Sequence, residues 1–140
     1  HAPRMACFLV IDDDNTLRQL MAVTLETAGH RVMQAASGSE GAALFKNVPA
    51  DVVVTDVIMP ADSIDLVIAL HQQHPKVPFI VVSGLGVQAP RTQEIAQALG
   101  ARQTLAKPFR LPDFLAAADA VVAELPPLPS MPPPVKKKWW

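Results

Sequence analysis

Five short apolar runs recur along the chain, and the stretches between them carry apolar residues at helical spacing. The two central runs, VVVT and FIVV, are almost free of polar residues, which is typical of strands covered by helices on both faces. The pattern therefore predicts five strands. They are residues 6–11, 31–35, 52–55, 79–82 and 103–106.

The stretches between these runs predict helices with recognisable ends. Apolar positions recur at helical spacing from Leu17 onward, and Gly29 follows as a C-terminal stop. The segment SGSE, from Ser37 to Glu40, matches a capping box, in which each of the two side chains satisfies a free backbone N–H at the helix start. Pro112 falls in the first turn of the last helix, where its missing N–H costs nothing. The predicted helices are residues 17–28, 37–47, 65–74, 92–99 and 111–125.

The strict alternation of strands and helices predicts the architecture. Strands joined by helices in this way are parallel with right-handed crossovers, so the five units form an α/β fold with a doubly wound five-stranded parallel sheet. A chain of 140 residues is long enough for one such domain and too short for two ordinary ones. In sheets of this kind the ligand lies at the carboxyl ends of the strands, beside the topological switch point. The residues that end each strand are therefore the candidates for chemistry.

The two ends of the chain differ from the predicted domain. After Leu125 the composition changes to PPLPSMPPPVKKKWW, which is typical of a disordered or polyproline II tail. Its KKKWW end leaves contact with a partner or a membrane surface as a minor alternative. Residues 1–5 begin with histidine rather than methionine and are interpreted as an N-terminal extension or an expression remnant. We expect the domain to span residues 6–125 and the tail residues 126–140.

Composition narrows the classes of function. Half of the residues are hydrophobic, 18% are charged and the net charge is −1, so the basic surface that nucleic-acid phosphates require is missing. No run approaches the ~20 apolar residues that span a bilayer, and the first run leads into acidic residues instead of a signal-cleavage site. The single cysteine, Cys7, lies in that run, where a reduced and buried thiol is expected. These features predict a cytoplasmic protein that binds neither nucleic acid nor a membrane.

Polar residues stand at the carboxyl ends of four predicted strands. Asp12 and Asp13 follow the first strand, Asp56 the third, Ser83 the fourth and Lys107 the fifth. Three carboxylates this close repel one another unless a cation lies among them, and a hard divalent ion such as Mg²⁺ suits oxygen ligands. The lysine charge and the serine hydroxyl suit an oxyanion such as a phosphoryl group. Together these residues predict phosphoryl transfer.

Four segments carry a resemblance to a known family. LVIDDD, VVVTDVIMP, FIVVSG and LAKPF, in this order and at these separations, resemble the receiver domain of bacterial two-component response regulators over about residues 6–125. The resemblance implies a flavodoxin-like sheet with strand order 2-1-3-4-5. It also implies that a sensor histidine kinase or a histidine phosphotransfer protein supplies the phosphoryl group from a phosphohistidine. The phosphorylated domain would then change its binding to a downstream protein target.

The same resemblance implies roles for individual residues. Asp56 would be the phosphoacceptor, and Ser83 and Lys107 would bind the phosphoryl oxygens. The chain would be no enzyme beyond accepting the phosphoryl group from its donor and slowly releasing it. The implied Mg²⁺ ligands are Asp13, Asp56, the backbone carbonyl of Ile58 and, through a coordinated water, Asp12.

The segment DDDNTL also resembles the DxDGTL signature of haloacid-dehalogenase-type phosphatases. In those enzymes the first aspartate is the nucleophile and the second is the acid/base, and Asp12 and Asp14 fit that pattern. Such enzymes also need a final acidic pair at a strand end, whereas this chain offers only Asp113 and Asp119 on a predicted helix. In the receiver interpretation Asp14 begins the first helix. A receiver-like module that binds its partners without phosphate is the other alternative.

The chain departs from the family pattern in three places. PADSIDL is one residue shorter than the usual segment and has Ser63 in place of a glycine, which leaves the loop after Asp56 open. Thr104 stands where the family usually has an aromatic residue that reports phosphorylation, so that readout cannot operate. Gly84 replaces the more frequent alanine, which matters little because the residue stays small. No output domain follows within these residues, so we expect either output through direct protein contact or a chain that is a fragment of a hybrid kinase or a longer regulator.

Overall fold

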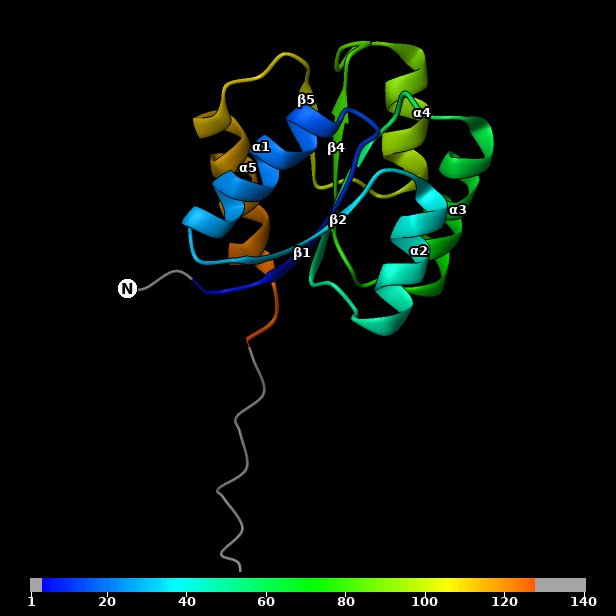
Figure 1. Cartoon of the computed structure of the whole chain (residues 1–140). Coiled ribbons are helices and arrows are strands. Elements are labelled where there is room, and N and C mark those ends of the chain that lie inside the picture. Colours follow the sequence, from blue (N-terminus) through cyan, green and yellow to red (C-terminus); the bar gives the residue numbers. More distant parts are fainter. Residues whose placement is uncertain (1–3, 128–140) are drawn as a thin grey trace, which may run out of the picture.

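The computed structural model describes residues 4–127, in which strands and helices alternate along the chain (Figure 1). Residues 128–140 lie outside the described part, so the tail interpretation stays a prediction. The strands are β1 (Cys7–Ile11), β2 (Arg31–Ala35), β3 (Val52–Asp56), β4 (Phe79–Ser83) and β5 (Gln103–Ala106). The helices are α1 (Asn15–Thr27), α2 (Gly38–Asn47), α3 (Ala61–Gln73), α4 (Pro90–Ala98) and α5 (Leu111–Glu124).

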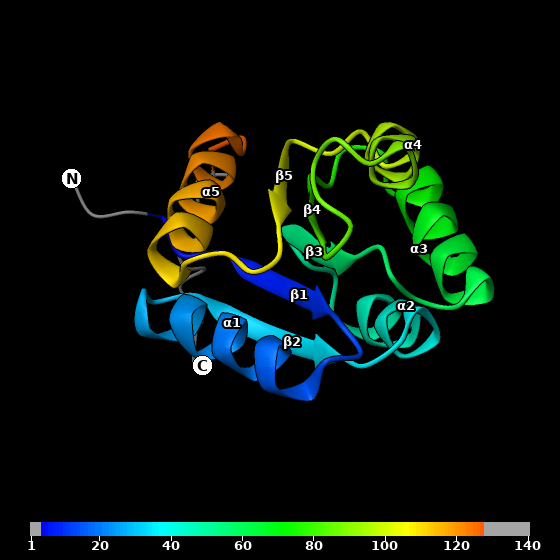
Figure 2. The same cartoon turned by 90° about the horizontal axis from the view of Figure 1, so that it is seen from above.

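The sheet confirms the predicted doubly wound topology. All strands pair in parallel in the order β2-β1-β3-β4-β5. Figure 2 shows the sheet between two layers, with α1 and α5 on one face and α2, α3 and α4 on the other. The strand order reverses between β1 and β3, so the carboxyl ends of these two strands form the switch point where a ligand is expected.

One apolar cluster on each face of the sheet holds the layers together. Along β1, Phe8 and Val10 pack with α1 and α5, whereas Leu9 and Ile11 pack with α2, α3 and α4. Side chains alternate between the two faces because successive Cβ atoms of a strand point in opposite directions. Every residue of β3 and β4 is buried, which explains why these two runs are apolar throughout.

Several predicted helix ends are present in the structure. The Asp14 side chain caps α1 by accepting from the N–H of Leu17 at 3.1 Å. Ser37 caps α2 in the same way, with its hydroxyl accepting from the N–H of Glu40 at 3.2 Å. Gly29, which follows α1, has a φ of 98°, a left-handed conformation that a residue without a Cβ adopts at little cost.

Helix α3 begins at Ala61, earlier than the apolar spacing predicted. Pro60 enters the helix with an extended backbone, and Asp62 places a negative charge in the first turn, where the helix dipole favours it. Ser63 is buried against α2, so closely that a Cβ on Gly38 would lie 2.2 Å from the Ser63 carbonyl oxygen. The shortened PADSIDL segment is therefore mostly helix, and its contact with α2 requires a glycine.

Smaller differences concern element ends and the cysteine. Asp56 and Ser83 are the last residues of β3 and β4 rather than the first residues beyond them, and α4 already begins at Pro90. Cys7 is free and only partly buried; burial and the negative charge of Asp51 raise the pKa of its thiol. Among residues 4–127, no helix has the length and apolar character needed to cross a membrane.

Candidate functional site

The carboxyl ends of four strands bring the predicted residues to one edge of the sheet. Asp56 ends β3 beside Val82 of β4, and Asp12 directly follows β1. Ser83 ends β4 and Lys107 directly follows β5, with the Lys107 N–H donating to the Ser83 carbonyl at 2.8 Å. Residues far apart in the sequence meet here because parallel strands all end on the same side of the sheet.

Three carboxylates form a compact cluster at this edge. Carboxylate oxygens of Asp12, Asp13 and Asp56 all lie within 4.8 Å of one another. Asp12 and Asp56 are 0% and 2% exposed, whereas Asp13 is open to solvent. Hard oxygen ligands at such spacing, with one side open to water, suit Mg²⁺. The three carboxylates therefore fit this ion, while a ligand role for the Ile58 carbonyl stays a prediction.

Lys107 supplies a positive charge inside the cluster. Its Nζ donates to Oδ2 of Asp12 at 2.8 Å and lies 3.4 Å from Oδ1 of Asp56. Burial alone would lower the pKa of Lys107, but its hydrogen bond to Asp12 and the charge of Asp56 outweigh burial, and the pKa is raised. The ammonium group thus stays charged and can donate to an anion that enters the site.

Backbone N–H groups of the following loop hold Asp56. Its Oδ1 accepts from Val57 at 2.8 Å and from Ile58 at 3.2 Å. Burial and the negative charge of Asp12 raise the pKa of Asp56 above its ordinary value, and Lys107 and the Ile58 N–H offset this only in part. A cation at the cluster would stabilise the ionised form of Asp56, because it opposes the effect of Asp12.

The Ser83 hydroxyl lies at the same edge, but its hydrogen bonds are with the loop after β4 and with α4. Its Oγ accepts from the N–H of Leu85 at 3.1 Å and lies 2.7 Å from Oγ1 of Thr92, in the first turn of α4. Both hydroxyl-bearing residues are fully buried. Sequence reasoning missed Thr92, because one threonine near a helix start carries no sign that its hydroxyl contacts the end of a strand.

Two large apolar side chains flank the cluster and remain open to solvent. Ile58 and Leu85 are 49% and 52% exposed. The Ile58 side chain extends toward Gly84, where an added Cβ would lie 3.2 Å from its Cδ1. The loops after β3 and β4 are therefore in contact next to Asp56.

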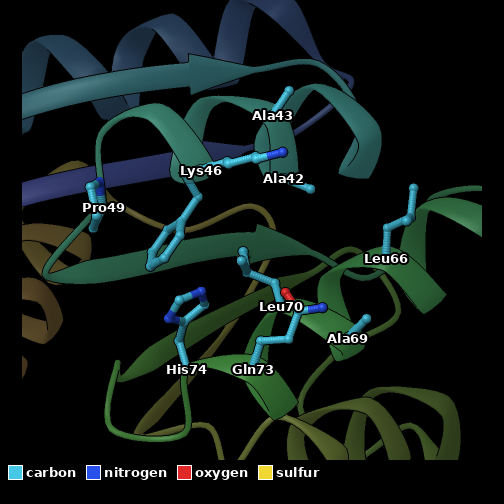
Figure 3. Close-up of a pocket in the computed structure, with 10 residues that line it drawn as sticks. Ala42, Ala43, Lys46, Pro49, Leu66, Ala69, Leu70, Gln73 and His74 are labelled. Atoms are coloured by element: carbon cyan, nitrogen blue, oxygen red, sulfur yellow. The ribbon is translucent and has the colours of Figure 1, made fainter.

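A separate groove of about 560 Å³ lies between α2 and α3, and none of the site residues lines it (Figure 3). Its walls are mainly apolar and include Phe45 and Leu70. Its polar lining residues are Lys46, Gln73 and His74. The lining contains no carboxylate. The groove therefore cannot contribute to the acidic site at the strand ends.

Residues 8–119 match the family model described as the response regulator receiver domain. The chain belongs to this family. Receiver domains are signalling modules of two-component systems rather than metabolic enzymes, bind Mg²⁺ at an acidic pocket, and interact with histidine kinases and downstream effectors. The resemblance seen in the sequence is thereby confirmed.

Receiver proteins from several organisms are similar to most of this chain. Protein PilH of Pseudomonas aeruginosa is 30% identical over 122 residues, which cover 85% of this chain and 99% of PilH. The structure of chemotaxis protein CheY4 of Vibrio cholerae matches with a TM-score of 0.74 at 30% identity, over 84% of this chain and 99% of CheY4. The DNA-binding dual master transcriptional regulator RpaA of Synechocystis is 30% identical over 121 residues. These cover 84% of this chain but 49% of RpaA, so the receiver spans about half the length of that relative.

The phosphatase alternative is not favoured by family or by geometry. Asp14, which would be its acid/base, caps α1, and its own N–H donates to Oδ1 of Asp12 at 2.9 Å. The two later acids lie on α5 rather than at a strand end, with Asp113 in the first turn and Asp119 at 3.9 Å from His30. They form no acidic pair beside the cluster.

Proposed function

We propose that Asp56 is the phosphoacceptor of this receiver and takes a phosphoryl group from a phosphohistidine of a sensor histidine kinase or a histidine phosphotransfer protein. The observation that carries the proposal is the position of Asp56: a buried carboxylate at the end of β3, within 4.8 Å of two other carboxylates and 3.4 Å from Lys107. This arrangement places a nucleophilic oxygen where both a metal ion and a fixed positive charge can act on the same phosphoryl group.

Asp12, Asp13 and Asp56, with the Ile58 carbonyl, would hold Mg²⁺. When bound, the ion offsets the negative charge of the cluster and so allows an anionic phosphoryl group to approach. The Asp56 carboxylate attacks phosphorus, the new O–P bond forms, and the N–P bond of the phosphohistidine breaks with its electron pair returning to the imidazole nitrogen. No proton is taken from Asp56, because it reacts as the carboxylate.

Lys107 and Ser83 would bind the transferred group. The Lys107 ammonium already lies beside Asp56. It would donate a hydrogen bond to a phosphoryl oxygen and balance part of its negative charge. Ser83 offers a hydroxyl proton to a second oxygen. Charge and hydrogen bonding at the site then differ between the free and the phosphorylated domain, and this difference changes the binding of a downstream protein target.

Intact-mass measurement after incubation with acetyl phosphate and Mg²⁺ tests the proposal. We expect wild-type protein to gain the mass of one phosphoryl group, and Asp56→Asn, whose amide has the same shape but cannot attack phosphorus, to gain none. A folded wild type that gains no mass would instead indicate a binding module that works without phosphate. Catalytic release of inorganic phosphate by Asp56→Asn would indicate a phosphatase that uses another nucleophile.

A further inference from the structure

The hydrogen bond between Ser83 and Thr92 links the strand-end site to α4, a helix that has no role in the proposed phosphoryl transfer. Ser83 ends β4, and Thr92 lies in the first turn of α4, a helix that packs on the same face of the sheet as α2 and α3 (Figure 2). Their hydroxyl oxygens are 2.7 Å apart, and both residues are fully buried.

The hydrogen-bonding capacity of a hydroxyl limits what Ser83 can do. A serine hydroxyl has one proton to donate and two lone pairs to accept with. The N–H of Leu85 already donates to one lone pair, at 3.1 Å. The hydrogen bond with Thr92 uses either the second lone pair or the proton of Ser83. A phosphoryl oxygen only accepts, so binding it requires the single proton of Ser83 and an orientation of the hydroxyl toward Asp56 instead of α4.

We propose, resting on the proposed function of Asp56, that Thr92 is a positioning residue that holds the Ser83 hydroxyl on α4 in the unphosphorylated domain. Phosphorylation of Asp56 draws the hydroxyl toward the phosphoryl group and breaks its bond with Thr92. The buried Thr92 hydroxyl then lacks a partner, which is unfavourable enough to shift the first turn of α4. Through this step α4 registers the state of Asp56.

The contact between Ser83 and Thr92 offers a readout of phosphorylation that does not need the usual aromatic residue. Thr104, which stands in the aromatic position, is half-buried in β5 beside Val81 and carries no ring that could report the position of Ser83. Thr92 instead reaches Ser83 directly from α4. The surface that changes on phosphorylation is therefore expected to include the N-terminal turn of α4.

The test uses beryllium fluoride with Mg²⁺ as a stable substitute for the phosphoryl group, titrated against the full chain. If binding must break the Ser83–Thr92 bond, then Thr92→Val, which removes only the hydroxyl from a side chain of the same shape, binds beryllium fluoride about three- to tenfold more tightly than wild type. Thr92→Ser keeps the hydroxyl and should bind as wild type does. In a Ser83→Ala background, Thr92→Val should have no further effect.

Amide NMR spectra provide a second readout. Beryllium fluoride should shift the amide signals of the first turn of α4 in wild type, whereas in Thr92→Val, which has no hydroxyl to lose its partner, this shift should be much smaller. If Thr92→Val does not fold, Thr92→Ala, which leaves space rather than a methyl group, serves for the same comparison. Thermal melts establish which variants are folded.

Three results would overturn the role of Thr92. The first is wild-type affinity together with a wild-type α4 response in Thr92→Val. The second is a Thr92→Ser variant that behaves like Thr92→Val, since the effect would then come from packing. The third is wild-type protein that neither binds beryllium fluoride nor is labelled at Asp56, which would refute the proposed function along with this inference. Normal binding and labelling of the wild type, together with either of the first two results, would refute the inference alone.

Discussion

The Nζ of Lys107 donates a 2.8 Å hydrogen bond to Oδ2 of Asp12, although 95 positions separate the two residues in the sequence. Lys107 follows β5 at one edge of the sheet and Asp12 follows β1, with β3 and β4 between them. The lysine side chain therefore crosses the carboxyl ends of two strands, and in doing so it approaches Asp56 to 3.4 Å. One cation balances two buried carboxylates.

Replacing Lys107 with alanine should destabilise the metal-free domain and reduce its structural response to phosphorylation. The change leaves Asp12 and Asp56 without their charge partner, and losing a hydrogen bond to a charged group in a mostly buried place costs about 1–3 kcal/mol of the free energy of unfolding. Urea denaturation in EDTA measures this loss, and added Mg²⁺ should recover part of it. The variant should still be labelled at Asp56 but show a reduced change in amide hydrogen exchange on labelling.

Lys76→Ala is the matched control, because Lys76 is an exposed lysine just before the start of β4, at the edge of the sheet opposite the carboxyl ends of the strands. It should unfold at the urea concentration of wild type. Equal stability of Lys107→Ala and wild type in EDTA, or an unchanged exchange response, would contradict the assigned role of the Lys107 charge.

The stability of the metal-free domain should depend on pH through Asp56. Burial and the charge of Asp12 raise the pKa of Asp56 above its ordinary value of 3.8, so the folded domain binds a proton that the unfolded chain has already released. The free energy of unfolding therefore falls as pH rises from the ordinary value through the raised one. Asp56→Asn has no carboxyl group to titrate at this position, so it does not lose this stability. Its free energy of unfolding relative to wild type should increase over that pH range and then level off.

Urea denaturation of both proteins in EDTA across an acidic pH series measures this difference. Saturating Mg²⁺ should reduce or reverse it, since the ion favours the ionised Asp56 of wild type and an amide is a poorer ligand. A stability difference that is constant at every pH would show that the environment of Asp56 does not disfavour its charge.

Gly38→Ala should destabilise the contact between α2 and α3. The new Cβ would lie 2.2 Å from the backbone carbonyl oxygen of Ser63, which cannot move aside without shifting a helix, so a loss of about 1–3 kcal/mol is expected from overpacking. Gly84→Ala is the control, because its Cβ would meet only the flexible end of Ile58 at 3.2 Å. Thermal melts that rank Gly84→Ala as the more damaging change would contradict this packing.

The sequence was most informative where one physical cause acts along a single element. Alternating apolar runs and helical spacing predicted all five strands to within one residue of their ends, because strands that are buried on both faces consist almost entirely of apolar residues. The meeting of Asp12, Asp56 and Lys107 followed from the shared direction of parallel strands. Neither the early start of α3 nor the contact of Ser83 with Thr92 was predictable, since both depend on how separate elements pack against each other.

We expect the residues that flank Asp56 to determine how water reaches the phosphorylated aspartate. Hydrolysis of an acyl phosphate requires a water in line with the leaving carboxylate, and side chains two positions beyond Asp56 and two beyond Ser83 flank that approach in the family. In this chain they are Ile58 and Leu85, which are 49% and 52% exposed. Ile58 also extends across to Gly84, so the two loops together present an apolar border. Neither side chain can hydrogen-bond a water.

The phosphorylated domain should therefore be long-lived. Help in positioning water, worth about 1–3 kcal/mol or roughly ten- to a hundredfold in rate, is absent when both flanking groups are apolar. Ile58→Asn combined with Leu85→Glu should restore it and speed the loss of the phosphoryl group by about that factor, as measured by intact mass at intervals after the phosphodonor is removed. Because both side chains are largely exposed, the pair should change stability little, and Ile58→Leu with Leu85→Ile is an apolar control that should keep the slow rate. A wild-type half-life of seconds in Mg²⁺ buffer, or a double variant no faster than the control, would mean that water reaches the phosphorus by a route these side chains do not govern.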